Sequence, residues 1–426
     1  MYGPTDIASA SEPATRFRWV VVVMLTAIIL INYIDRSAIS YAMGPMAKEL
    51  GLSEFQKGLI LGAFGIGYAV TTLIGGILVD RFGARIVLAL SVIFWSAATA
   101  ITGIASSFFL VLAARAALGL AEGPMFPGQT GAIARWLPER ERVRAFGYSL
   151  VAVPLSLAIG APVVSYLTSV SGWREMFFIL GAISLAWVPV WWVFFRDDPQ
   201  SDPVADADRE SAKAERQFAQ HATSWSELLT SPTLLANYWA FFVFGYFLFF
   251  FMTWLPGYLE TTFKLDLTSV GWFSVAPWLT AATALVILGN LSDKLQERTG
   301  RLRVSRTYLI AGTQALAAMV ILPVAFTANL TLALLLITVA VGASMGANAA
   351  FYAVNVDVAE DRSATALGIM DFGFALSGFI APVATGWIVG EQGGFAEAFL
   401  LLSALAASSV IVTLLFHRPD KEKFGR

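Results

Sequence analysis

Five ionisable residues interrupt the long apolar stretches of this chain, and they are its clearest candidates for chemistry: Asp35, Arg36, Arg115, Glu122 and Asp371. A charge at mid-bilayer costs about 2.5–3.5 kcal/mol, so such residues face a polar cavity or one another. Any one of them can serve as a structural ion pair, but the set favours function. Two arginines and three acids sum to −1 when ionised, and one bound proton makes the set neutral. The set is suited to binding an anion and exchanging protons.

Their spacing suggests how these groups meet. Asp35 and Arg115 each lie eight residues from the same end of their apolar segments, about 12 Å along a helix. An Asp35–Arg115 ion pair is therefore geometrically allowed. Arg115 and Glu122 are seven residues apart and share one helix face. Asp35 and Arg36 point about 100° apart, so one of them can face the fourth apolar segment while the other faces a central cavity.

The composition excludes several classes of protein. Of the 426 residues, 57% are hydrophobic and only 14% charged, with a net charge of −2. This excludes a soluble enzyme, a disordered protein and a nucleic-acid binder. No cysteine is present, and the two histidines, His221 and His417, lie in polar segments. We therefore expect no disulfide, no cofactor and no metal site within the membrane.

No other motif indicates an enzyme. The chain has no G-x-x-x-x-G-K-[ST] loop for ATP. The string from Gly342 to Gly346 matches G-x-S-x-G, but it lies in an apolar segment without an available histidine. Close packing of small residues between helices explains it better.

Twelve apolar segments are each long enough to cross a hydrocarbon core of about 30 Å as a helix. Backbone polar groups must be satisfied internally in lipid, so the prediction is an all-α membrane protein of twelve transmembrane helices. The first segment is too long for a signal peptide, and we expect none. The predicted spans are 17–43, 56–79, 86–105, 107–134, 145–168, 174–195, 233–259, 267–291, 304–326, 330–356, 363–388 and 395–416.

Loop charges predict the orientation and the domain organisation. The tails and alternate loops on one side carry 22 of the 28 Lys and Arg residues, so the positive-inside rule places both termini in the cytoplasm of a multi-pass inner-membrane protein. The predicted parts are an N-tail, a six-helix bundle, a cytoplasmic linker, a second six-helix bundle and a C-tail, at residues 1–16, 17–196, 197–232, 233–417 and 418–426. The linker is a flexible tether or, alternatively, carries a surface helix around Ala212–Ala219.

A faint repeat supports two pseudo-symmetric halves. The stretch from Gly76 to Asp80 closes the second span, and the stretch from Gly289 to Asp293 closes the eighth, 213 residues later. Duplicated six-helix halves around a midplane site are a transporter architecture.

Several strings resemble the major facilitator superfamily and, within it, the anion:cation symporter family. The stretch 76–85, GILVDRFGAR, resembles the superfamily's signature between spans two and three. The narrower resemblance rests on NYIDR at 32–36, RAALGLAEGPMFP at 115–127, WLP at 136–138 with Glu141 and Arg142, GWR at 172–174 and TWLPGY at 253–258. The resemblance covers essentially the whole chain and implies the major facilitator fold.

The resemblance also implies roles for individual residues. Arg36 would bind the substrate carboxylate, Tyr33 and Tyr68 would line the N-terminal half of the cavity, Asp35 and Glu122 would carry protons, and Arg115 would balance them. A gating latch against span eleven is implied for Gly76, Asp80, Arg81 and Arg85, with Asp293 as the weaker C-terminal counterpart. Candidate cavity residues of the C-terminal half are Trp254, Trp278, Asn348, Tyr352, Asn355, Asp371 and Phe372.

Asp371 departs from the pattern, because family members often have Asn there. It accepts hydrogen bonds from substrate hydroxyls or an amine, or it is a third proton site, and the sequence leaves these alternatives open.

The resulting hypothesis is a monomeric carrier that imports a small organic anion, such as a sugar acid or an aromatic or dicarboxylic acid, with protons by alternating access. Its partners would be the substrate, protons and the lipid bilayer, and no nucleic acid. Sodium could replace the proton. The alternatives are proton-driven efflux of drugs or metabolites, and a membrane receptor that transports nothing.

Overall fold

The computed structural model describes residues 12–197, 225–359 and 362–421. These ranges contain helices and no strand, which confirms the prediction of an all-α protein. The predicted tails are described only in part, and the segment around Ala212–Ala219 lies outside the described residues.

The first half of the chain consists of α1 (Glu12–Leu50), α2 (Glu54–Ile104), α3 (Phe108–Glu122), α4 (Met125–Trp136), α5 (Glu139–Ser171) and α6 (Trp173–Phe194). The second half consists of α8 (Trp225–Thr230), α9 (Pro232–Phe263), α10 (Leu267–Phe273), α11 (Val275–Thr299), η1 (Arg303–Thr307), α12 (Tyr308–Ile321), η2 (Leu322–Phe326), α13 (Leu330–Gly346), α14 (Asn348–Val358), α15 (Ser363–Gln392) and α16 (Ala396–Phe416).

Eleven helical segments in the described ranges are long and apolar enough to cross a membrane. One of them belongs to α2, whose 51 residues would measure about 76 Å if straight, more than twice the hydrocarbon thickness. The chain instead turns back at Gly83, whose φ of 80° and ψ of 156° are accessible mainly to glycine. The helix therefore supplies two spans, and the described chain crosses twelve times, as predicted.

Three predicted spans are broken helices, contrary to expectation. Span 107–134 consists of α3 and α4, which separate at Gly123 and Pro124. Span 267–291 is interrupted at Ser274 and span 330–356 at Ala347. The described end of the linker also differs from a plain tether, because α8 makes it helical just before α9.

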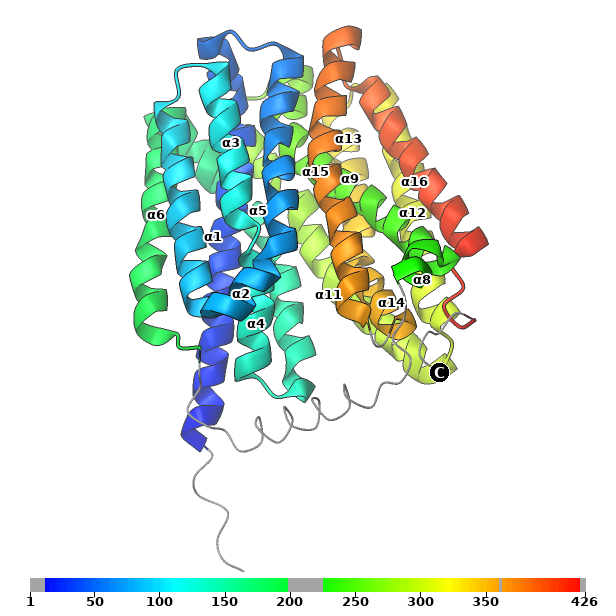
Figure 1. The fold of residues 1–426 in the computed structure, drawn as a ribbon. Coiled ribbons are helices and arrows are strands. Elements are labelled where there is room, and N and C mark those ends of the chain that lie inside the picture. The colour runs from blue at the N-terminus through cyan, green and yellow to red at the C-terminus, as the bar shows by residue number, and fades with distance from the viewer. Residues whose placement is uncertain (1–11, 198–224, 360–361, 422–426) are drawn as a thin grey trace, which may run out of the picture.

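Both described chain ends lie on one side of the molecule, called here the termini side, and the opposite side is called the far side. Figure 1 shows the start of α1 and the C-terminus at this same end, with the two halves standing next to each other as separate bundles. The first residues of the predicted C-tail are hydrogen-bonded to the C-terminal bundle. The carboxylate of Asp420 accepts hydrogen bonds from the backbone N–H groups of Leu302 and Arg303 at 2.8 and 2.9 Å.

The bundles meet on the far side through glycines of α2. A β-carbon added at Gly58 would lie 2.7 Å from the carbonyl oxygen of Pro382 on α15. One added at Gly62 would lie 2.8 Å from the carbonyl oxygen of Phe379, and one at Gly65 would collide with the same stretch of backbone. Since glycine has no side chain, the two helices touch backbone to backbone. We call this contact the far-side seam.

On the termini side, the side-chain contacts join parts of the same bundle. Asp197, just after α6, accepts a hydrogen bond from the backbone N–H of Arg85 at 3.1 Å and pairs with Arg135 at 3.5 Å. The Arg85 guanidinium donates to the carbonyl of Trp192 at 2.5 Å and lies over its ring. These contacts anchor the turn at Gly83 to the end of α6.

Candidate functional site

A buried ion pair lies at the centre of the N-terminal bundle, and it was not the pair the spacing suggested. Arg36 of α1 contacts the carboxylate of Glu122 of α3 through two nitrogens, at 2.8 and 2.9 Å. Both side chains are almost completely buried. A third contact, at 3.1 Å, joins the guanidinium to the side-chain oxygen of Asn32 one helical turn earlier. Such charge-assisted contacts offset much of the cost of burying two charges.

Three aromatic rings enclose the Arg36 guanidinium. Its central carbon lies 4.3 Å from the ring centre of Tyr33, 4.4 Å from that of Phe64 and 5.0 Å from that of Tyr68. Phe64 and Tyr68 are one turn apart on α2 and stack on each other. The absence of a side chain at Gly119 lets α3 touch the α2 backbone here. Cation–π contacts with desolvated rings stabilise the charge without neutralising it.

Asp35 and Arg115 do not form the ion pair that the spacing allowed. The Asp35 carboxylate accepts a hydrogen bond from the hydroxyl of Ser184 on α6 at 2.5 Å. The Arg115 guanidinium instead donates to the backbone carbonyl of Arg36 at 3.2 Å. The 100° offset between neighbouring residues explains this arrangement: Arg36 faces α3, the fourth span, and Asp35 faces α6.

The C-terminal bundle contributes a second acidic position. The hydroxyl of Tyr352 on α14 donates to the Asp371 carboxylate on α15 at 3.4 Å, and both side chains are partly exposed. Asn348 is also partly exposed, at the break between α13 and α14. Asp371 is therefore reachable from water in this conformation, whereas Arg36 is not.

Two further candidates of the C-terminal half are packing residues in this conformation. Trp254 is 3% exposed, and its indole N–H donates to the carbonyl of Pro382 at 3.1 Å. Asn355 is fully buried and donates to the carbonyl of Phe351 at 2.9 Å. Trp254 thereby joins α9 to α15, and Asn355 also donates to the sulfur of Met370 at 3.1 Å, which joins α14 to α15.

The predicted gating residues also differ from expectation in this conformation. Gly76 has no atom within 4 Å of an added β-carbon, so it mediates no close helix approach. Asp80 and Arg81 are exposed. Asp293 pairs with Arg306 of its own bundle at 3.2 Å. Of the predicted set, Arg85 contacts the end of α6 in its own bundle, together with Asp197, a residue that sequence reasoning did not single out.

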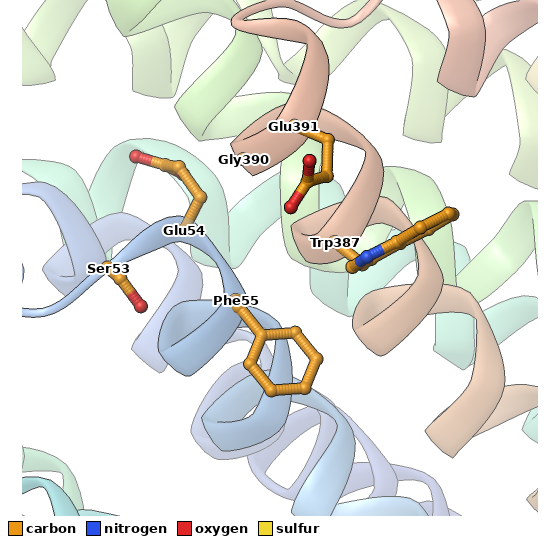
Figure 2. A pocket seen from close by; sticks show the side chains of 6 residues that line it. All are labelled: Ser53, Glu54, Phe55, Trp387, Gly390 and Glu391. Carbon is orange, nitrogen blue, oxygen red and sulfur yellow. The ribbon is translucent and has the colours of Figure 1, made fainter.

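A pocket of about 440 Å³ lies elsewhere, at the far-side end of the seam. Figure 2 shows it between the start of α2, with Ser53, Glu54 and Phe55, and the end of α15, with Trp387, Gly390 and Glu391. It contains none of the predicted site residues. Among the described residues, no group of three or more His, Cys, Asp or Glu could hold a metal ion.

Sequence reasoning missed three residues of the site: Asn32, Phe64 and Ser184. Asn32 and Phe64 each had a usable signal, because they lie four residues before Arg36 and Tyr68 and therefore on the same helix faces. Ser184 had none, since a serine in an apolar helix commonly bonds to its own backbone.

Two pseudo-repeated bundles of membrane-spanning helices, with a buried ion pair inside the first, define a membrane carrier of the alternating-bundle class. The chain belongs to the Major Facilitator Superfamily: the family model matches residues 25–347 and 299–425. The fold prediction and the family resemblance are therefore confirmed, and the chain is a transporter and not an enzyme.

Relatives and solved structures agree with this assignment. The chain is 33% identical to the "Probable sulfoacetate transporter SauU" of Cupriavidus necator, with 91% of each chain covered. It is 31% identical to the hexuronate transporter of Bacillus subtilis, with 92% of each covered. A crystal structure of a bacterial homologue of the human lysosomal transporter Spinster matches with a TM-score of 0.74 at 21% identity, covering 96% of this chain and 95% of that one.

Proposed function

We propose that this protein imports a small organic anion bearing a carboxylate, together with protons, by alternating access. The observation that carries the proposal is the buried Arg36–Glu122 ion pair inside its aromatic enclosure. The relatives named above carry organic acids, which supports the substrate class.

The ion pair suggests how substrate and proton are coupled. A guanidinium can bind a carboxylate through two parallel hydrogen bonds. Here two nitrogens of Arg36 contact one oxygen of Glu122, Oε2, so Glu122 occupies the guanidinium edge that a substrate carboxylate would use. A substrate carboxylate must therefore displace Glu122, whose charge would then be left buried without a partner. A proton on Glu122 removes that cost, so anion binding and protonation favour each other. Asp35, held by Ser184 nearby, is the proposed second proton site.

The far-side seam suggests the conformational cycle. Here the bundles are joined on the far side, while Asp80 and Asp293 are exposed on the termini side. With both termini cytoplasmic, as the loop charges indicate, this is an inward-facing conformation. Import then requires the seam to part and the termini-side ends of the bundles to meet. We propose a monomeric inner-membrane protein with two bundles at 17–196 and 233–417, joined by a cytoplasmic linker at 197–232.

Two substitutions test the ion pair in proteoliposomes with an imposed pH gradient. Arg36→Lys keeps the charge but loses the two-pronged contact, so uptake of an organic acid should fall at least tenfold. Glu122→Gln should abolish concentrative uptake while exchange of substrate for substrate persists, because the proton site coupled to Arg36 is gone and Arg36 stays available. Undiminished gradient-driven uptake by either variant would contradict the proposal. A sodium gradient in place of the pH gradient tests the coupling ion.

A further inference from the structure

The far-side seam fixes which residues face each other where the bundles begin to separate. Along α2 the contacts step from Gly58 to Gly62 to Gly65. On α15 the matching positions step backwards, from the turn 382–386 through Phe379 to the turn 375–378. The helices therefore run antiparallel in a regular register.

One further turn along this register brings Tyr68 of α2 level with residues 374–375 of α15, and Asp371 lies one turn beyond them. At the turn beyond, on α15, Gly368 has no atom within 4 Å of an added β-carbon, so the helices have parted there. Tyr68 and Asp371 thus lie at the inner edge of the seam, where the space between the bundles begins.

Tyrosines contact both charges, the buried Arg36 of the N-terminal bundle and Asp371 of the C-terminal bundle. Tyr33 and Tyr68 enclose Arg36 from the N-terminal bundle. Tyr352 donates its hydroxyl to Asp371 in the C-terminal bundle. The arrangement is polar, with a fixed cation at one end, an acid at the other and phenol hydroxyls between them.

We propose that Asp371 selects substrates with a single negative charge and hydroxyl groups at the other end, that is, polyhydroxy monocarboxylates, against dianions. This inference rests on the proposed function and names its substrate class. With its carboxylate on Arg36, an extended acid directs its far end toward Asp371. A terminal hydroxyl there donates a hydrogen bond to the Asp371 carboxylate, and the tyrosine hydroxyls can both donate and accept along the chain.

A second anionic group at that end meets a like charge instead. At an effective dielectric constant of about 20, two like charges about 8 Å apart weaken binding about thirtyfold. A dianion can enter only if Asp371 takes up a proton with it. Discrimination is therefore largest at alkaline pH, where that proton is scarce. Among the described residues, the titratable group in contact with Asp371 is Tyr352 on α14, while Tyr33 on α1 and Tyr68 on α2 lie against Arg36 in the other bundle.

Galactonate and galactarate form a matched pair of probes, because they differ only in a terminal hydroxymethyl group against a terminal carboxylate. Competition for binding is measured at pH 8 on the purified full chain, and counterflow in proteoliposomes. The wild type should prefer galactonate about thirtyfold. Asp371→Asn keeps an acceptor for Tyr352 but removes the charge. The preference should therefore fall at least tenfold, because the variant binds galactarate more tightly than the wild type does. Tyr352→Phe keeps the charge and should keep the preference.

The possible outcomes distinguish failure of this inference from failure of the proposed transport function. Equal or better binding of galactarate by the wild type, or an unchanged preference in Asp371→Asn, would overturn the role of Asp371 while leaving organic-anion transport intact. Preference for an amino acid such as alanine over galactonate would also overturn it, in favour of an ammonium partner for Asp371. No binding or transport of any organic acid would refute the proposed function itself.

Discussion

A single methyl group placed in the far-side seam should shift the balance between the two conformations. In Gly62→Ala the new β-carbon would lie 2.8 Å from the carbonyl oxygen of Phe379 and 2.9 Å from a methyl carbon of Val383. Ordinary contacts of this kind are about 3.5–4.0 Å. The oxygen belongs to helix backbone and cannot rotate away, so the helices must separate.

The size of the effect follows from overpacking, which typically costs about 1–3 kcal/mol. Only the conformation with a closed seam bears this cost, because alternating access separates these helices in the other one. The closed-seam population should therefore fall about fivefold to 160-fold relative to the other state.

The absence of cysteine from the chain makes the assay direct. Cysteines introduced at Thr130 on α4 and Glu297 on α11, both exposed and on the termini side, carry a pair of spin labels. Pulsed electron resonance should report a shorter distance between them in Gly62→Ala, as the termini side closes. Gly312→Ala, where no atom lies within 4 Å, is the matched control and should leave the distance unchanged. Identical distance distributions in Gly62→Ala and wild type would refute the reasoning.

Two further predictions concern the termini side. Burial, with a smaller contribution from Arg303, lowers the pKa of His417 from 6.5 to about 4, so the folded protein keeps this ring neutral while the unfolded chain protonates it. The free energy of unfolding therefore decreases as the pH falls from about 6.5 towards 4. At pH 5 it should be about 2 kcal/mol lower than at pH 8. The melting temperature of His417→Gln should vary less between these two pH values than that of the wild type. An equal change in both proteins would exclude His417 as the cause of the pH dependence. Asp197→Ala removes a backbone hydrogen bond and a partly exposed ion pair to Arg135, so it should destabilise by about 1–2 kcal/mol. Asp80→Ala should cost under about 0.5 kcal/mol, and equal thermal shifts in the two variants would contradict the role of Asp197 in anchoring the turn at Gly83.

Much of the fold was predictable because its causes are local. Each predicted span depends on about twenty consecutive apolar residues, and every one reappears as helix. The reversal at Gly83 could be predicted for the same reason, since charged residues and a glycine follow the second span. The breaks at Ser274 and Ala347 were not predictable, because neither residue type interrupts a helix by its own propensity.

The site was predictable as a set of residues but not as a set of contacts. Burying charge in lipid is costly for any sequence, so Asp35, Arg36, Arg115 and Glu122 had to gather. Depth arithmetic paired Asp35 with Arg115 because it counts residues along the helix axis. The observed pair, Arg36 with Glu122, depends on the rotation of α1 and α3 about their own axes, which neighbouring helices decide.

The amino-acid sequence by itself determined the class of protein, the number of membrane crossings and the identity of the charged residues that must avoid lipid. These follow from hydropathy and from the energetic cost of a buried charge, which act residue by residue. Tertiary structure alone decided that Glu122 pairs with Arg36, that Ser184 donates to Asp35 and that α2 packs against α15 at the seam. Each of these contacts joins helices far apart in the chain, and helix packing selects one rotation and one register among many that the same hydrophobic pattern allows.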